Sequence, residues 1–311
     1  MIESVVDIRG LSKRFGRVRA VDGLDLEVPE GDIFGLLGPN GAGKTTTLRI
    51  LAGLLRPGKG SVRVLGLDPG TSHARIASRV GMMIEGPGLH PNLSARRNLD
   101  LFGRLKGLGK SARKNEVAKA LDFADLGDGA GRPVKGYSSG MRQKTALALA
   151  FMGSPDLIVL DEPTSGLDPA SVVRLRETIR DLRRSRGTTF LLSSHHLAEM
   201  ETLCSTVAII AFGRVLAAGN PDALRPKGPA VHRLRVSDGE RAAACASSLE
   251  GVSVIRAGPS EMAVEANPDA VPVLVRALLE ASVEVSEVRP ARSRLEEAYM
   301  EWTREGGKGP R

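Results

Sequence analysis

The sequence lacks the features that mark several special classes of protein. It has only two cysteines, Cys204 and Cys245, which lie far apart and outside any CxxC pattern. Such usage excludes a disulfide-stapled scaffold and is typical of a reducing, intracellular setting. The longest apolar runs, residues 146–153 and 207–212, are far shorter than the roughly 20 residues that a membrane-spanning helix needs. We therefore expect no membrane-spanning segment in this chain.

Acidic residues are outnumbered, and the imbalance is confined to one part of the chain. Across 311 residues, 44 Lys+Arg and 36 Asp+Glu give a net charge of +8. Residues 1–220 carry 31 and 22 of these, or +9, and residues 221–311 carry 13 and 14, or −1. A basic surplus can indicate nucleic acid, a membrane surface or an anionic ligand. For the basic stretch 90–135, a solvated charged face is the simplest interpretation.

Composition and length indicate an ordinary globular protein of two domains. A hydrophobic content of 41% and a charged content of 26% exclude a disordered or collagen-like chain. At roughly 100–200 residues per domain, the length predicts two domains.

The first part of the chain has the pattern of an α/β fold. Residues 23–28 alternate like a half-buried strand, and an apolar run at 32–38 leads through glycines into a predicted helix at 45–54. Two further apolar runs, 157–162 and 188–194, are typical of parallel strands buried on both faces, and a helical pattern lies between them. Residues 207–219 predict a hairpin around Gly213. We place this domain at residues 1–220.

A Pro/Gly-rich joint at residues 220–230 precedes a change of pattern. The predicted elements that follow come in the order β-α-β-β-α-β, which is that of a small ferredoxin-like α+β unit. We place this second domain at residues 221–311 and expect it to be an accessory or regulatory module.

Residues 38–45 read GPNGAGKT and match the phosphate-loop pattern G-x-x-x-x-G-K-[ST] in full. The glycines allow the backbone to curl so that several N–H groups point at phosphate oxygens. Lysine supplies positive charge for the β- and γ-phosphates, and the threonine hydroxyl can bind Mg²⁺. The predicted nucleotide-binding residues of this loop are Gly38, Pro39, Asn40, Gly41, Ala42, Gly43, Lys44, Thr45 and Thr46.

A second acidic site supports the phosphate loop. The apolar run 157–160 ends in Asp161 and Glu162. Asp161, at the end of the strand, could hold Mg²⁺ as a Walker-B aspartate does. Glu162 could orient and polarise the attacking water. Alone, two acids after a strand are weak evidence, but beside a complete phosphate loop they predict a functional site for Mg²⁺ and the attacking water.

Six ordered motifs in residues 5–220 resemble the ATP-binding subunits of ABC transporters. Besides the two sites above, YSSGM (137–141) is similar to the signature sequence, SGLD (165–168) to the D-loop, SSHH (193–196) to the switch-histidine segment, and KRFG places Phe15 at the base-stacking position. YSSGM and the segment around Glu85 are similar to the drug-, bacitracin- and lantibiotic-resistance branch. The resemblance implies a P-loop NTPase cassette with a mixed sheet, antiparallel N-terminal strands and a helical subdomain at about 86–136.

The resemblance also implies roles for particular residues. Glu162 and His195 would be catalytic, with His196 the alternative switch histidine. Thr45, Asp161 and Glu85 would bind Mg²⁺, although Glu85 stands where the family usually has glutamine. Further nucleotide contacts would come from Phe15 and, across a head-to-tail dimer, from Ser138, Gly140 and Asp168.

These features together predict an ATP-binding and ATP-hydrolysing subunit that powers export of a drug, antibiotic or peptide. The cofactors would be ATP and Mg²⁺. The partners would be integral membrane permeases and a second nucleotide-binding subunit, at the cytoplasmic face of the membrane. No nucleic-acid partner is expected. The alternative is a soluble ABC ATPase acting on ribosomes or nucleic acid, but such proteins generally carry two cassettes or a long coiled coil. A GTPase would need an NKxD motif, which the sequence lacks.

Overall fold

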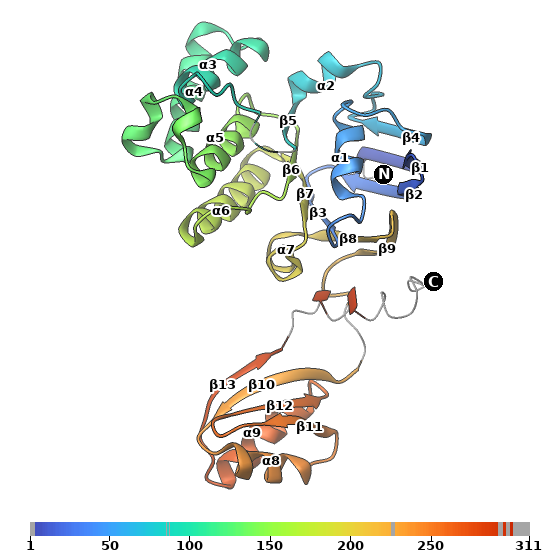
Figure 1. Ribbon diagram of the computed structural model, residues 1–311, viewed down its shortest axis with the longest axis vertical. Coiled ribbons are helices and arrows are strands. Elements are labelled where there is room, and N and C mark those ends of the chain that lie inside the picture. Colours follow the sequence, from blue (N-terminus) through green and yellow to red (C-terminus); the bar gives the residue numbers. More distant parts are fainter. Residues whose placement is uncertain are drawn as a thin grey trace. The chain divides into compact units, whose positions relative to one another are not determined.

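The computed structural model describes residues 4–84, 86, 88–224, 228–291, 295–296 and 299–300. The chain divides into two compact units, with the division between Ala223 and Leu224. Figure 1 shows the first unit in blue to yellow and the second in orange to red. Within the described residues, no helix is both long and apolar enough to cross a membrane.

The first unit contains two sheets and most of the helices. Its strands are β1 (Ser4–Phe15), β2 (Val18–Pro29), β3 (Ile33–Leu37), β4 (Lys59–Val64), β5 (Val80–Met83), β6 (Leu157–Asp161), β7 (Thr189–Ser194), β8 (Thr206–Ala211) and β9 (Arg214–Gly219). Its helices are α1 (Lys44–Leu51), α2 (His73–Arg79), α3 (Ala95–Leu105), α4 (Lys110–Ala124), α5 (Ser139–Phe151), α6 (Pro169–Arg186) and α7 (Leu197–Leu203), with 3₁₀ turns at Gly127–Gly131 and Val134–Gly136.

The central sheet has the strand order β5-β6-β7-β3-β8-β9. Its strands run parallel except β9, which pairs antiparallel with β8 as the predicted hairpin. All residues of β3 and β7 are buried, as expected for strands covered on both faces. Because the strands are parallel, the carboxyl ends of β3, β6 and β7 lie at one edge, where ligands bind in open α/β sheets. The predicted mixed α/β architecture is confirmed.

A second sheet, in the order β2-β1-β4, is antiparallel. Helices α3 and α4 follow β5 and pack with α5 around their own apolar cluster, which includes Leu99 and Val134. Helices α3 and α4 lie within the predicted helical subdomain, at about 86–136, whereas α5 begins after it. The three helices are coloured teal to green in Figure 1.

The second unit has its elements in the order β10 (Ala230–Val236), α8 (Gly239–Ser247), β11 (Val252–Ala257), β12 (Glu261–Ala266), α9 (Ala270–Glu280) and β13 (Val285–Pro290). Its four strands pair antiparallel in the order β11-β12-β10-β13. Apolar side chains from alternate strand positions and from both helices form its core, for example Leu234, Val264 and Leu274. This unit therefore has an apolar core of its own.

Candidate active site

The phosphate-loop sequence forms the turn between β3 and α1, at the edge of the sheet where the parallel strands have their carboxyl ends. Gly43 precedes the helix with φ of 105°, and a Cβ there would collide with the carbonyl oxygen of Ala20. A Cβ on Gly38 would collide with the carbonyl oxygen of Ile210. Glycine is therefore required at both positions by the neighbouring backbone. Since the first N–H groups of a helix have no partner within it, the start of α1 is suited to bind an anion.

Lys44 lies at the first position of α1, and its side chain is only 6% exposed. Its Nζ donates to the carbonyl oxygens of Gly38, at 2.6 Å, and Pro39, at 3.2 Å. Burial lowers the pKa of Lys44, and the carboxylates of Glu162 and Asp161 oppose that shift. The carbonyl oxygens of the loop thus hold the Lys44 ammonium group close to the expected position of the phosphate oxygens.

Thr45 and Asp161 bring together two oxygen atoms that could bind a metal ion, at the edge of the sheet where β3 and β6 end. Thr45 Oγ1 donates a hydrogen bond to Asp161 Oδ2 at 2.8 Å. The other carboxylate oxygen, Oδ1, accepts a hydrogen bond from Ser193 Oγ. This contact follows from the parallel register of β6 and β7, in which Asp161 is the partner of Ser193. Asp161 is therefore fixed from both sides.

Glu162 follows β6 and points toward both the loop and the switch-histidine segment. Its Oε1 lies 3.6 Å from Lys44 Nζ, and its Oε2 lies 2.9 Å from Nδ1 of His195. The backbone of Glu162 has φ of 48°, in the left-handed region that non-glycine residues seldom adopt. His195 is 41% exposed, and its ring contacts that of His196 at 3.9 Å between centroids. A carboxylate between a lysine and an imidazole is well placed to act as a general base beside the phosphate loop.

Phe15 ends β1 and pairs with Val18 across the turn to β2. It is 45% exposed, and Lys13 Nζ lies 5.6 Å from its ring centroid. The β2 residue Ala20 contacts the loop at Gly43 through its carbonyl oxygen. The hairpin therefore presents an exposed aromatic ring at the end of β1, beside the strand β2 that borders the loop.

Ser138, Gly140 and Asp168 form a second group. Ser138 caps α5 by accepting from Met141 N at 3.2 Å. Asp168 caps α6: it accepts from Ser171 N at 2.9 Å and Ser171 Oγ at 2.6 Å, and its Oδ2 lies 3.4 Å from Lys144 Nζ. The bonds from Ser171, aided by Lys144, lower the pKa of Asp168. In the described part of the chain, no hydrogen bond or ion pair joins this second group to the phosphate loop.

The structure thus brings Gly38 to Thr46, Asp161, Glu162 and His195 into one cluster and places Ser138, Gly140 and Asp168 in another. Glu85, predicted as a Mg²⁺ ligand, lies outside the described residues. Sequence reasoning gave no role to Ser193 or Gln143, although SSHH contains the first and the second follows YSSGM by two positions. Only strand register and helix packing reveal their contacts.

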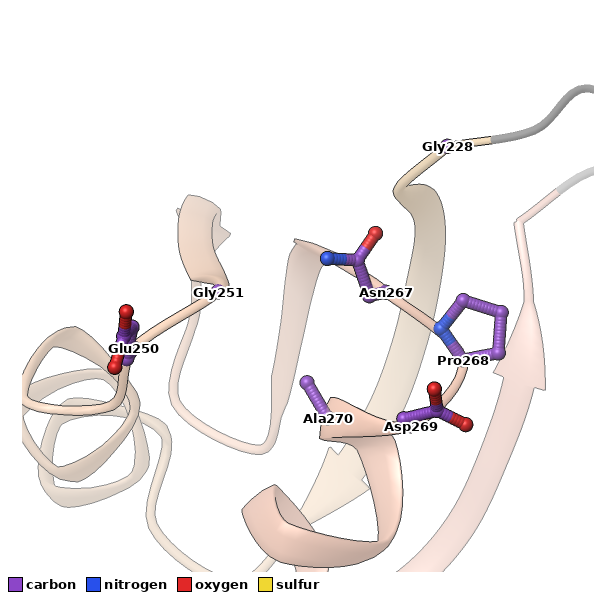
Figure 2. Close-up of a pocket in the computed structure, with 7 residues that line it drawn as sticks. All are labelled: Gly228, Glu250, Gly251, Asn267, Pro268, Asp269 and Ala270. Carbon is purple, nitrogen blue, oxygen red and sulfur yellow. The ribbon is translucent and has the colours of Figure 1, made fainter.

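The second unit has an open surface pocket of about 620 Å³. Figure 2 shows it at the start of α9, with the carboxylates of Glu250 and Asp269 among the lining side chains. Among the described residues that line it, two are acidic and none is basic. The described part of the lining is therefore acidic.

Comparison with known proteins identifies the family. The family model described as "ABC transporter" matches residues 21–165. Over 311 aligned residues the chain is 36% identical to the daunorubicin resistance ATP-binding protein DrrA3 of Streptomyces coeruleorubidus, covering 97% of each chain. The chain belongs to the ABC transporter family. It is an ATP-binding subunit of the ABC type, and ATP hydrolysis is its activity.

Further relatives of this ABC subunit are ATP-binding proteins named for drug resistance or for export. It is 38% identical to the daunorubicin/doxorubicin resistance ATP-binding protein DrrA of Streptomyces peucetius, over 96% of this chain and 92% of that one. It is 43% identical to the Nod factor export ATP-binding protein I of Burkholderia lata, over 70% and 72%. These relatives give no support to the alternative of a soluble ABC ATPase acting on ribosomes or nucleic acid.

Solved structures of ABC-type cassettes match a part of this chain about as long as the first unit. A structure of an ATP-binding subunit of an ABC transporter has a TM-score of 0.66 and 28% identity, covering 71% of this chain and 92% of that one. A dimeric ATP-binding cassette in a post-hydrolysis state, bound to ADP and Pi, has a TM-score of 0.63 at 23% identity, over 69% and 98%. Its likeness shows that the ABC subunit shares the cassette fold.

Proposed function

We propose that this ABC subunit powers the export of a drug or antibiotic through separate membrane-spanning permease subunits, at the cytoplasmic face of the membrane. The convergence of Lys44, Thr45, Asp161, Glu162 and His195 on one loop carries the ATPase part of the proposal. The export part rests on near-full-length relatives whose names state daunorubicin resistance. The proposed cargo also includes peptides.

Each site residue receives a role from its position. Loop residues 38–46 bind the triphosphate, and the ring of Phe15 stacks on the base. Glu162 accepts a proton from the attacking water, and His195, 2.9 Å away, steadies the carboxylate and the γ-phosphate. The second cluster, Ser138, Gly140 and Asp168, contacts the ATP held by a partner subunit.

We also propose that two such subunits, either two copies or this chain with a related one, sandwich two ATP molecules. Ser138 and Gly140 lie at the start of α5, whose positive end favours an anion. Residues 1–220 would be the nucleotide-binding domain, with residues 86–136 as its helical subdomain. Residues 221–311 would be an accessory domain that regulates or supports this assembly.

The oxygen donors at the sheet edge fit Mg²⁺. Thr45 Oγ1 and the Asp161 carboxylate are ligands of the hard type that Mg²⁺ prefers, and they lie 2.8 Å apart. The ion would neutralise charge on the β- and γ-phosphates. Glu85 remains a proposed further ligand.

Replacing Asp161 with asparagine should raise the Mg²⁺ concentration for half-maximal ATP hydrolysis by at least about tenfold, because even outer-shell changes at metal sites cost that much. A Mg²⁺ titration of ATPase activity measures this. Asp156→Asn is the matched control: Asp156 precedes the other end of β6 and pairs with Arg79 at the surface. Equal Mg²⁺ dependence of Asp161→Asn and wild type would rule out the ligand role.

An apolar groove of about 270 Å³ is the proposed docking site for the permease. It lies among residues from β5, α2, α3 and α5, including Met82, Ile76, Phe102 and Leu149. Leu54 also lines it and is 65% exposed. The groove combines residues of the sheet region with residues of the helical region, so its occupant would contact both. We propose a short helical segment of the permease with apolar side chains.

Leu54→Arg should abolish co-purification of this chain with the proposed membrane-spanning permease subunit. It should also abolish the ATP-dependent efflux of a test drug, daunorubicin, from vesicles that hold both proteins. A buried arginine in an apolar contact has no compensating partner. ATP hydrolysis by the isolated subunit should stay within about twofold of wild type, since an exposed position affects stability little. Leu279→Arg, at a 57% exposed leucine of the second unit, should change neither property. Normal assembly and efflux by Leu54→Arg would contradict the docking proposal.

A further inference from the structure

Helix α5 contacts the loop that carries Glu162. Gln143 lies on the first turns of this helix, five residues after Ser138. Its Nε2 donates to two consecutive backbone carbonyl oxygens, those of Glu162 at 3.3 Å and Pro163 at 3.1 Å. Both bonds are partly buried, so water competes with them only in part. Helix α5, which begins within YSSGM, is called the signature helix below. Its residue Gln143 thus holds the backbone of the candidate catalytic residue Glu162.

The backbone of Glu162 needs such support. Its φ of 48° lies in a region that persists for non-glycine residues only when the surroundings hold it. On one side its N–H donates to the carbonyl oxygen of Ser193 in β7, at 3.1 Å. On the other side its carbonyl oxygen accepts from Gln143 and from Ser165 N. The direction of the Glu162 side chain therefore depends on both β7 and α5.

Two more contacts join the start of α5 to the same loop. A Cβ on Gly140 would lie 3.0 Å from the carbonyl oxygen of Gly166, so the two backbones pack closely. Lys144 Nζ, one residue after Gln143, lies 3.4 Å from Asp168 Oδ2. The signature segment and loop 162–168 are thus tied at the beginning, middle and end of the loop.

We infer that Gln143 is a positioning residue: it sets the Glu162 carboxylate for hydrolysis in this chain's own site and links it to the signature helix. This inference rests on the roles proposed above for Glu162 and for Ser138 and Gly140. Because Ser138 and Gly140 would contact ATP held by the partner, the link makes hydrolysis at one site sensitive to nucleotide at the other.

The test is a donor series at position 143 in the full chain. Gln143→Met and Gln143→Glu keep the length of the side chain but remove the hydrogen-bond donor. In Gln143→Glu, the new carboxylate would also face the carbonyl oxygens of Glu162 and Pro163. Both should lower kcat by roughly tenfold or more, since small misplacement of a catalytic group has effects of that size. The KM for ATP should change less than twofold. Gln143→Lys, which restores a donor of similar reach, should recover most of kcat.

A second measurement separates positioning from general structural damage. If Gln143 acts through Glu162, Gln143→Met should have little further effect on single-turnover hydrolysis in a Glu162→Gln background. Equal fold-losses in both backgrounds, a parallel rise in KM, or wild-type kcat for both donor-free variants would each overturn the inference. If wild type itself hydrolysed no ATP, the proposed function would fail instead. Thermal unfolding of each variant checks that loss of kcat occurs in folded protein.

Discussion

Glu162→Gln should retain ATP binding and lose ATP hydrolysis by about 10²- to 10⁴-fold, the range expected when a general base is removed. Glutamine has nearly the same shape as glutamate but cannot accept the proton of the attacking water. Affinity for ATP should not fall. Glu162 lies 3.6 Å from Lys44, so loss of its charge leaves the lysine to interact with the phosphates. Equilibrium ATP binding and steady-state hydrolysis measure the two effects separately.

Glu116→Gln is the matched control for this change. Glu116 lies in α4 of the helical region, where it pairs with Lys119 and accepts from Gly153 N. The same isosteric substitution there should leave hydrolysis within about twofold of wild type, because Glu116 contacts Lys119 and Gly153 rather than the phosphate loop. Near-normal hydrolysis by Glu162→Gln would refute the role of general base. A fall in ATP affinity equal to the fall in turnover would point instead to a binding role.

The sequence predicted the phosphate loop because its glycines and lysine are required by local chemistry. Gly43 confirms this local logic: its φ of 105° and the nearby Ala20 carbonyl exclude any side chain. The strands at 157–161 and 189–194 were predictable because strands buried on both faces form continuous apolar runs. The pattern of residues in β1 does not by itself predict a strand. Its pairing with β2 contains several register shifts, which break the alternation of apolar and polar residues.

Contacts between distant segments could not be predicted in the same way. Asp161 bonds to Ser193 only because β6 and β7 are parallel and in a particular register. Gln143 reaches the Glu162 carbonyl only because α5 packs beside the end of β6. Local propensity does not encode either arrangement, since both depend on the packing of elements far apart in the chain. The candidate site residues could therefore be named from the sequence, whereas the side chains that hold them in place could not.

Lys44→Ala should weaken ATP binding by roughly 10- to 150-fold, the equivalent of a lost charged hydrogen bond worth about 1.5–3 kcal/mol, and should lower hydrolysis with it. Lys44 is the described cation that lies directly beneath the loop, and its Nζ is already oriented by the carbonyl oxygens of Gly38 and Pro39. Calorimetry or a fluorescent ATP analogue measures the affinity.

The stability of the nucleotide-free protein distinguishes loss of binding from loss of folding. Burial lowers the pKa of Lys44 in the folded state, which means that holding its charged form there costs stability at neutral pH. Alanine removes this cost, so the unfolding temperature without ATP should not fall, whereas the rise produced by ATP should largely vanish. Lys106→Ala is the control: Lys106 also has its pKa lowered by burial and donates to the Met152 carbonyl, remote in sequence from the loop. That variant should keep the ATP-dependent rise. An undiminished rise in Lys44→Ala would mean that the phosphates bind without this lysine.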